Sequence, residues 1–340
     1  MPAAHLTRKA NNTQPRRLAY HVRRHISGAY RMGIVNSTVL TSLRTAYSSY
    51  FEQAKAAAPA QWAQVATLVP STSTSNTYGW LGQFPKLSEW SGARSYKSIK
   101  EYGYTVTNIK YEASVKIPRE AFEDDNLGIY TPLFQEMGYA AATHPDEIIF
   151  GLLKAGKTND CYDGKKFFAK DHPVYPNVDG TGSAGTAANL IEPTEGAVDP
   201  WFLLDVSRPL KPFIFQERTK AELDAITSTD NDSVFNDDEY PFGIRYRCNG
   251  GYGFWQQAVC STEALNPASF EKALTLMQSQ KADGGRPLGL GFGGKASTLL
   301  VVPPTHQAAA RKVLAAERDD SGASNIWYDA AVLLVSPWLL

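Results

Sequence analysis

One glycine-rich stretch, GLGFGGKAS at 289–297, has the residue types of a phosphate-binding loop. The spacing from Gly289 through Gly294 to Lys295 matches the first seven positions of the pattern G-x-x-x-x-G-K-[ST], in which backbone amides and the lysine hold phosphates. However, Ala296 stands where the magnesium-binding Ser or Thr is required, and the stretch leads into an apolar β-run instead of a helix. We therefore interpret it as a flexible bend that enters a strand. A nucleotide-binding enzyme that uses this stretch is the remote alternative.

Three other clusters have suitable residue types without the spacing that chemistry requires. Cys161 precedes His172 in KDHP, yet no known local cysteine-protease signature surrounds the cysteine. The acidic run 230–239 lacks the spacing and central glycine of a calcium-binding EF-hand loop, so we expect a solvated loop there. The acidic residues at 123–126 can equally cap or pair with the helix after them. The sequence thus predicts no catalytic residues, no metal site and no cofactor.

Composition is that of a folded protein without a membrane segment. The chain has 340 residues, of which 43% are hydrophobic and 20% charged, and this allows one large domain or two to three modest ones. No stretch approaches the roughly 20 apolar residues that a membrane span needs. The three cysteines are too few for a disulfide framework and lack the paired spacing of a zinc site. We expect synthesis in a reducing cytoplasm.

The net charge of zero is unevenly distributed. Residues 1–32 contain seven Lys or Arg and no acid, which leaves 27 bases against 34 acids in the remaining chain. A basic extension on an acidic body is typical of proteins that meet nucleic acid or an acidic partner surface, although a solvated tail is the alternative. The prediction singles out five arginines of this extension: Arg8, Arg16, Arg17, Arg23 and Arg24.

Two long helices are predicted from apolar periodicity. The first begins near residue 36 and ends before the Ser/Thr-rich run 69–77, which we expect to be extended or loop and outside the core. The residues on its apolar face are Leu40, Leu43, Tyr47, Tyr50 and Phe51. The second helix covers 131–156 and exceeds the usual length, with a kink expected at Pro145.

Between these helices, residues 78–117 predict a long open hairpin or a pair of strands. Apolar alternation along 104–117 changes phase near Asn108, which indicates a bulge or twist. A two-stranded ribbon is marginal alone, so this one needs a partner surface. Further strands are predicted in 201–217, 242–261, 298–302 and 330–340, and helices in 267–280 and 305–317. The fold class is therefore α+β.

Several stretches, in order from about Met32 to the last residue, resemble the major head subunit (gpT) family of Mu-like phages and prophages. The most specific are EDDNLGIY (123–130), SRPLKPFIFQ (207–216) and LVSPWL (334–339). Residues 1–31 depart from the family pattern, because its members look as if they begin near MGIVNS.

The resemblance implies the HK97-type capsid fold, with long, named segments. It would assign 1–32 to a basic N-terminal extension, 33–75 to an N-arm, 76–117 to an extended loop over the adjacent subunit, 118–180 to a peripheral domain with the spine helix 131–156, 181–325 to an axial domain, and 326–340 to a returning C-terminal strand. For contacts between subunits, the prediction names Trp80, Phe84, Trp90 and Arg94.

The implied function is assembly and not catalysis. The resemblance implies a major capsid protein that forms hexamers and pentamers of an icosahedral shell around double-stranded DNA. Its partners would be other copies, scaffold and portal proteins, and weakly and non-specifically bound packaged DNA, with no membrane partner. It would be assembled in the bacterial host cytoplasm and reside in the virion capsid. A cellular nanocompartment shell of the same fold is the alternative.

Overall fold

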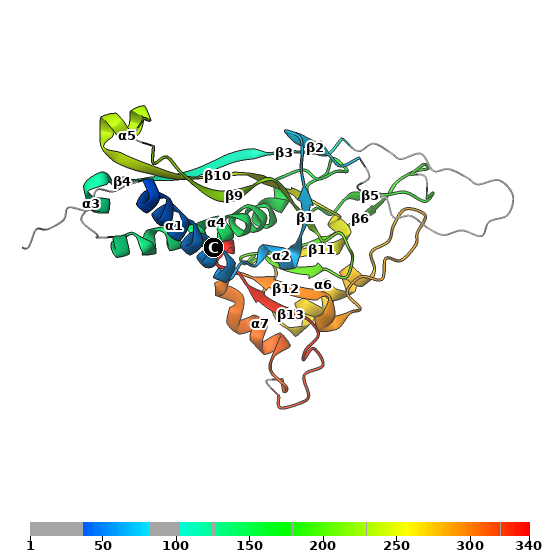
Figure 1. Ribbon diagram of the computed structural model, residues 1–340. Helices are drawn as coiled ribbons and strands as arrows, with labels where there is room; N and C mark the ends of the chain where they lie inside the picture. Colours follow the sequence, from blue (N-terminus) through cyan, green and yellow to red (C-terminus); the bar gives the residue numbers. More distant parts are fainter. Residues whose placement is uncertain are drawn as a thin grey trace, which may run out of the picture. The chain divides into compact units, whose positions relative to one another are not determined.

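The computed structural model describes residues 37–79, 81, 103–123, 127–178, 180–228, 230–319 and 321–340 (Figure 1). The α-helices are α1 (Ser37–Ala57), α2 (Trp62–Val65), α3 (Arg119–Glu123), α4 (Thr131–Lys154), α5 (Asp232–Asp237), α6 (Pro267–Gln278) and α7 (Gln307–Leu314). The strands are β1 (Ala66–Pro70), β2 (Ser75–Thr77), β3 (Thr105–Thr107), β4 (Ile109–Pro118), β5 (His172–Val174), β6 (Gly185–Ala187), β7 (Leu190–Ile191), β8 (Trp201–Asp205), β9 (Phe213–Ala225), β10 (Glu239–Tyr252), β11 (Ala258–Ser261), β12 (Thr298–Val302) and β13 (Val332–Val335).

A four-stranded sheet has the order β1-β9-β10-β4. β1 runs parallel to β9, and the other neighbouring strands are antiparallel. β9 and β10 form one long hairpin that carries α5 at its turn (Figure 1). Every second residue of β10 from Tyr240 to Cys248 is buried, as expected for a strand with one face on the core.

The helices α1 and α4 pack together under this sheet. Gly138 of α4 lies so close to α1 that an added Cβ would be 2.3 Å from the Phe51 carbonyl oxygen. The predicted apolar face of α1 is confirmed, because Tyr47 and Phe51 are buried. The second predicted helix is observed as α4, which continues through the buried Pro145.

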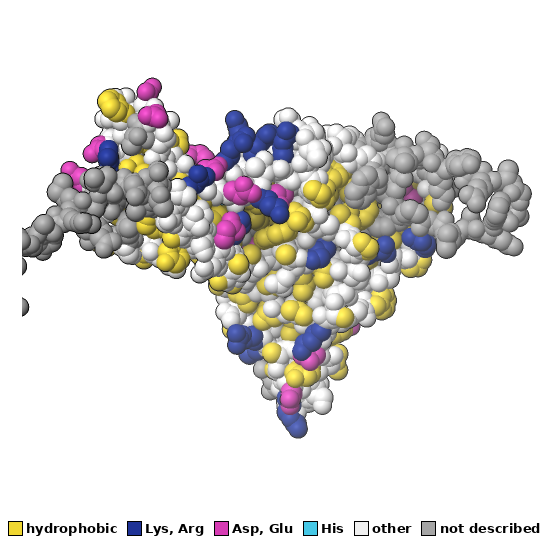
Figure 2. All heavy atoms as spheres, in the orientation of Figure 1, with side chains coloured by type: hydrophobic (Ala, Val, Ile, Leu, Met, Phe, Trp, Pro, Cys, Tyr) yellow, Lys and Arg dark blue, Asp and Glu magenta, His cyan; other side chains and the backbone are white. Residues whose placement is uncertain are grey.

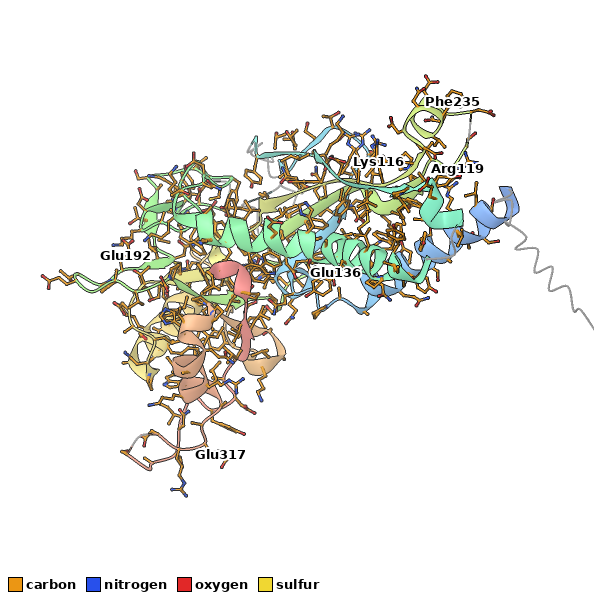
Figure 3. All side chains as sticks on the ribbon, turned by 90° about the vertical axis from the view of Figure 1, so that its left-hand side faces the viewer. Lys116, Arg119, Glu136, Glu192, Phe235 and Glu317 are labelled. Carbon is orange, nitrogen blue, oxygen red and sulfur yellow. The ribbon has the colours of Figure 1, made fainter. Side chains whose placement is uncertain are left out.

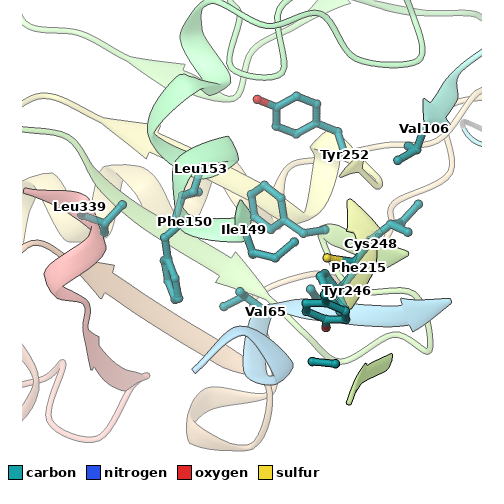
Figure 4. Close-up of a cluster of buried hydrophobic side chains, with 14 of the residues drawn as sticks. Val65, Val106, Ile149, Phe150, Leu153, Phe215, Tyr246, Cys248, Tyr252 and Leu339 are labelled. Atoms are coloured by element: carbon teal, nitrogen blue, oxygen red, sulfur yellow. The ribbon is translucent and has the colours of Figure 1, made fainter. Parts of the chain in front are cut away.

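The C-terminal half of α4 supplies the apolar side chains on which several segments meet. Ile149, Phe150 and Leu153 are fully buried, and Figure 4 shows them among residues from α2, β3, β9, β10 and the C-terminal end of the chain. The labelled partners are Val65, Val106, Phe215, Tyr246, Cys248, Tyr252 and Leu339. Burial of large side chains from such distant segments is the main source of stability here.

A five-stranded sheet has the order β13-β12-β8-β11-β7. β8, β11 and β12 are buried along their whole length. Alternate residues of β8 belong to two cores, because Phe202 and Leu204 join the core with α4, whereas Trp201 and Leu203 join the core with α6 and α7. Burial on both faces explains why these strands are continuous apolar runs in the sequence.

The described strands in and next to the segment 78–117 pair with two different partners. β2 pairs with β3, but β4 instead pairs with β10 in the four-stranded sheet. The change occurs at Asn108, which lies between the two strands and is buried. The predicted change of phase is therefore a switch of the chain from one partner strand to another.

Two local expectations are wrong: the run 69–77 is not wholly outside the core, and the acidic run 230–239 is not simply a loop. Ser71, in the run expected outside the core, is buried, and its hydroxyl accepts a hydrogen bond from the Asn108 amide at 2.9 Å. The acidic run 230–239 contains the helix α5. Residues 181–325 contribute β9 and β10 to the sheet with β4, and β8, β11 and β12 to the other sheet.

Candidate functional site

The glycine-rich stretch forms a bend and not a phosphate cradle. Gly289 and Gly291 have φ angles of 67° and 71°, in the left-handed region that favours glycine. The Gly291 N–H donates to Oδ2 of the buried Asp205 at 2.7 Å, so this amide is already used. The stretch then enters β12 through a 3-10 turn, and Lys295 pairs with Asp329 at 2.5 Å. This geometry agrees with the sequence interpretation.

Asp163 lies between Cys161 and His172, and sequence reasoning missed it. The Cys161 thiol donates to Asp163 Oδ1 at 2.9 Å, and His172 Nδ1 lies 2.7 Å from Asp163 Oδ2. Burial raises the pKa of the Cys161 thiol, and the Asp163 charge raises it further, so a nucleophilic thiolate is disfavoured. The only sequence hint is the turn signal Asp163-Gly164, which bends the chain back.

These three residues could hold a metal by their type. Their ligand atoms lie within 4.8 Å of one another, the one such group within the described ranges. Each of these atoms already makes a hydrogen bond inside the cluster, and the Lys165 N–H also donates to Asp163 Oδ1 at 3.0 Å. The cluster is therefore satisfied as a hydrogen-bonded network without an ion.

The acidic run at α5 is paired with basic side chains from β4 and α3. Lys116 Nζ lies 2.7 Å from Asp237 Oδ2 and 3.2 Å from Glu239 Oε2. Arg119 lies 3.6 Å from Asp238. Figure 3 shows Lys116 and Arg119 next to the α5 region. Exposed pairs of this kind contribute little stability, but they fix the hairpin end to β4.

Several large apolar side chains of the described residues are exposed, among them one on α5 and three in the segments before β12 and β13. Phe235 of α5 is 80% exposed at the turn of the β9–β10 hairpin (Figure 3). Phe292 and Ile326 are 69% and 79% exposed, and Tyr328 is also exposed. The last three lie in the segments that enter β12 and β13, which are parallel neighbours, so they share one end of the five-stranded sheet. Exposed apolar clusters of this kind mark protein contact surfaces.

A third candidate surface is a shallow apolar groove of about 170 Å³ between α4 and β4. Its lining includes Tyr111 of β4 and Met137, Ala140 and His144 of α4. β4 is the edge strand of its sheet, so its outer backbone groups have no strand partner in the described part of the chain. On the face of the molecule that Figure 2 turns to the viewer, hydrophobic side chains are widely spread.

The two ends of the predicted extended loop are firmly anchored. The Tyr78 hydroxyl donates to Gln216 Oε1 at 2.8 Å, and the Tyr104 hydroxyl accepts from the Tyr252 N–H at 2.7 Å. Leu81 is fully buried. The predicted contact residues themselves lie outside the described residues, as do the five arginines of the basic extension: Trp80, Phe84, Trp90, Arg94, Arg8, Arg16, Arg17, Arg23 and Arg24. Among the helices that the structure describes, none is long and apolar enough to cross a membrane.

Solved structures of assembled shells are similar to this chain. The subunit of the bacteriophage JBD30 procapsid is 50% identical, with a TM-score of 0.80 over 89% of this chain and all of that one. The subunit of the bacteriophage JBD30 capsid is 40% identical, with a TM-score of 0.67 over 90% of this chain and all of that one. The fold is therefore the HK97-type capsid fold that the sequence resemblance implied.

Curated relatives lead to the same group of proteins. The major capsid protein of Escherichia phage Mu is 47% identical over 293 residues, which is 86% of this chain and 94% of the relative. The Mu-like prophage FluMu major head subunit of Haemophilus influenzae is 40% identical, over 84% of this chain and 92% of the relative. The model of the Mu-like prophage major head subunit gpT matches residues 40–339. The chain belongs to the family of Mu-like prophage major head subunits.

Proposed function

We propose that this major head subunit builds a closed icosahedral shell from hexamers and pentamers that encloses double-stranded DNA. The observation that carries the proposal is the match of residues 40–339 to the head-subunit family. Subunits around a rotation axis meet through heterologous contacts, in which two different surfaces of the same chain face each other. The exposed Phe235 and Phe292 lie on different elements, α5 and the segment before β12, which suits such contacts.

The segments would act in assembly as the resemblance suggests. Residues 76–117 would be an extended loop over a neighbouring copy, where Trp80, Phe84, Trp90 and Arg94 make contacts. The anchors at Tyr78 and Tyr104 support this role, because a loop that bears load between subunits needs fixed ends. In the other segments, α4 would be the spine of the peripheral domain, residues 33–75 the N-arm, and the five-stranded sheet the centre of the axial domain.

The shell would work with partners and without catalysis. We propose scaffold and portal proteins as assembly partners in the host cytoplasm, and packaged DNA as a weak, non-specific partner. Outside residues 1–32 the chain has seven more acids than bases, which favours an inner surface that does not hold DNA tightly. The JBD30 capsid has been solved with minor capsid protein trimers bound, and we propose a comparable decorating partner here.

Negative-stain electron microscopy of the full chain tests the proposal, with the protein expressed alone and together with its neighbouring head genes. We expect closed shells or capsomer rings in at least one condition. Monomers or dimers in both conditions would contradict the proposal. Trp80→Ala and Trp90→Ala should each give folded subunits that fail to close shells, and normal shells from both variants would remove the role of the extended loop.

The basic extension requires a separate variant. Deletion of residues 1–31 should reduce shell yield or shell stability if the extension reaches across neighbouring copies or contacts DNA or scaffold. The control is a full-length chain in which Arg8, Arg16, Arg17, Arg23 and Arg24 are all replaced by Gln, which retains the length and removes the charge. If both variants give shells of unchanged yield and stability, the extension has no role in assembly.

A further inference from the structure

A fully buried histidine has a partner on each ring nitrogen. His172 of β5 is 0% exposed. Its Nδ1 lies 2.7 Å from Asp163 Oδ2, and its Nε2 lies 3.2 Å from Asn189 Oδ1. A neutral imidazole has one N–H and one lone pair, whereas an imidazolium has two N–H groups. The protonation state of His172 therefore follows from what these two partners can donate or accept.

The amide of Asn189 can only accept from His172. Asn189 Nδ2 donates to the Phe167 carbonyl at 2.8 Å and to the Trp255 carbonyl at 3.2 Å, while Oδ1 accepts from the Ala169 N–H at 2.9 Å. A flipped amide would place an oxygen against two carbonyls and an NH₂ against an N–H. The orientation is fixed by three contacts, so Nε2 of His172 must carry a proton.

On the other side of the ring, Asp163 favours a second proton on the histidine. Its Oδ1 accepts from the Cys161 thiol at 2.9 Å and from the Lys165 N–H at 3.0 Å, and both bonds stabilise a carboxylate. One proton must lie between Oδ2 and Nδ1, because two lone pairs at 2.7 Å would repel. A carboxylate that already accepts two hydrogen bonds leaves this proton on Nδ1.

The indole of Trp255 completes the surroundings of the ring. The imidazole stacks on it with ring centroids 3.9 Å apart and an interplanar angle of 7°. An aromatic face stabilises a cation placed against it, especially where water is excluded. Asp163 supplies the counter-charge and is itself almost fully buried, with a side-chain exposure of 3%.

We propose that His172 is an imidazolium in the folded subunit at neutral pH, and that with Asp163 and Asn189 it forms a charged lock between the segment after α4 and the five-stranded sheet. Asn189 connects the two by its side-chain bonds to Phe167 and Trp255 and by its carbonyl, which accepts from the Cys260 N–H of β11. Trp255 itself lies between β10 and β11, where the chain passes from one sheet to the other. The lock thus acts at the junction of the two sheets.

The lock depends on pH through Asp163. Burial would raise the pKa of Asp163, but hydrogen bonds from His172 and Cys161 outweigh it and hold that pKa below its ordinary value. A lowered folded-state pKa means that the Asp163 contribution is present above the unfolded pKa and is lost as pH falls through the folded value. Other ionisable groups at the cluster are Cys161 and Lys165, together with Tyr162, Lys281 and Asp283, which line a small cavity with Asp163 and Trp255.

Magic-angle-spinning NMR of the full chain labelled with ¹⁵N-histidine tests the protonation state in free subunits and in shells alike. His172→Gln assigns the signals among the six histidines. We expect both ring nitrogens of His172 to resonate as protonated nitrogens at neutral pH. His144, which faces the exposed Glu147 at 3.5 Å, is the internal comparison. A lone-pair-bearing nitrogen in the His172 signals would overturn the proposal, and correlation of each ring with its own backbone amide assigns the signals if His172→Gln fails to fold.

Asp163→Asn tests the lock, and Asp171→Asn is its matched control, since Asp171 pairs with Lys165 on the exposed side of the same segment. Asp163→Asn should remove the Nδ1 proton of His172 at neutral pH and lower the melting temperature well below that of Asp171→Asn. It should also speed amide hydrogen exchange at Asn189 and Cys260. A His172 that stays doubly protonated in Asp163→Asn, or equal melting of the two variants, would refute the lock. Shell formation does not enter these readouts, so they are independent of the proposed function.

Discussion

The ring of Tyr47 on α1 stacks on the ring of Phe134 on α4, with centroids 4.1 Å apart and an interplanar angle of 21°. Phe242 of β10 meets both rings edge-on, at 5.8 Å and 4.9 Å. Burial raises the pKa of Tyr47 to about 12, so its hydroxyl stays neutral across the physiological range. One aromatic group therefore joins the first helix, the long central helix and the four-stranded sheet.

Removal of this central ring should destabilise the subunit strongly. Phe134 is fully buried, so Phe134→Ala removes apolar burial and leaves a cavity between three elements. We expect a loss of about 3–5 kcal/mol in the free energy of unfolding. Tyr139→Ala on the same helix is the control, because Tyr139 is 46% exposed and its loss should cost about 0.5 kcal/mol or less. Chemical denaturation measures the free energy of unfolding of both variants. Equal losses of unfolding free energy in Phe134→Ala and Tyr139→Ala would contradict the assigned role of Phe134.

Two glycines of α4 should respond to alanine in opposite directions. A Cβ on Gly138 would lie 2.3 Å from a backbone oxygen of α1, whereas a Cβ on Gly151 would meet nothing within 4 Å. We expect Gly138→Ala to cost about 1–3 kcal/mol by forcing the helices apart. Gly151→Ala should gain about 0.5–1 kcal/mol, because alanine favours the helix. The pair of melting temperatures checks this, and a stabilised Gly138→Ala would show that the α1–α4 contact is looser than described.

Asp146 of α4 should make stability depend on pH. Its buried carboxylate accepts from the backbone N–H groups of Gln61 and Trp62 at 2.9 Å and 2.6 Å, which fixes the start of α2. Burial raises its pKa, and these hydrogen bonds offset the increase only in part. A raised folded-state pKa means that the Asp146 contribution is largest below the unfolded value and falls as pH rises through the folded value.

As pH increases from about 4 to about 7, the melting temperature of wild type should therefore fall relative to that of Asp146→Asn. Asp224→Asn is the control, because Asp224 is exposed on β9 with a side-chain exposure of 81%. Its difference from wild type gives the response to loss of an exposed carboxylate, with which the Asp146 curve is compared. A flat Asp146 curve would mean that the hydrogen bonds to α2 fully offset burial.

The exposed aromatic rings should matter for assembly and not for folding. Phe235→Ser and Phe292→Ser each replace a side chain that is at least 69% exposed, so the melting temperature of the free subunit should change little. Shell yield, measured by sedimentation and microscopy, should fall for both variants if these rings lie at subunit contacts. Lys312→Ser on the exposed part of α7 is a control of similar size change. Full shell yield from both aromatic variants would show that Phe235 and Phe292 are not needed for contacts between subunits.

The elements with clear periodicity were predictable from the sequence. The apolar faces of α1 and α4, and the continuous apolar runs of β8 and β12, correspond to observed elements because burial selects the same residues that create the pattern. The rejection of the phosphate loop also rested on local context, since Ala296 and the following strand are both visible in the sequence.

Long-range pairing was not predictable in this way. The local sequence of β4 does not show whether the strand pairs with β3 in a ribbon or with β10 in the four-stranded sheet. The choice depends on 10 partner residues of β10, which are distant in sequence. The cluster of Asp163, His172, Asn189 and Trp255 likewise needs four segments brought together by the fold. Ser71 and Asn108 are polar, and their burial becomes favourable because they bond to each other and to groups of Ser73, Asn76 and Gln216.

The larger core contains Leu40 and Leu339, residues near opposite ends of the described chain. β13, at 332–335, also completes the five-stranded sheet beside β12. A growing polypeptide therefore lacks part of its larger core, and one strand of the five-stranded sheet, until the segment 332–339 has been made. The core around Leu40 can reach its final packing only after Leu339 has left the ribosome.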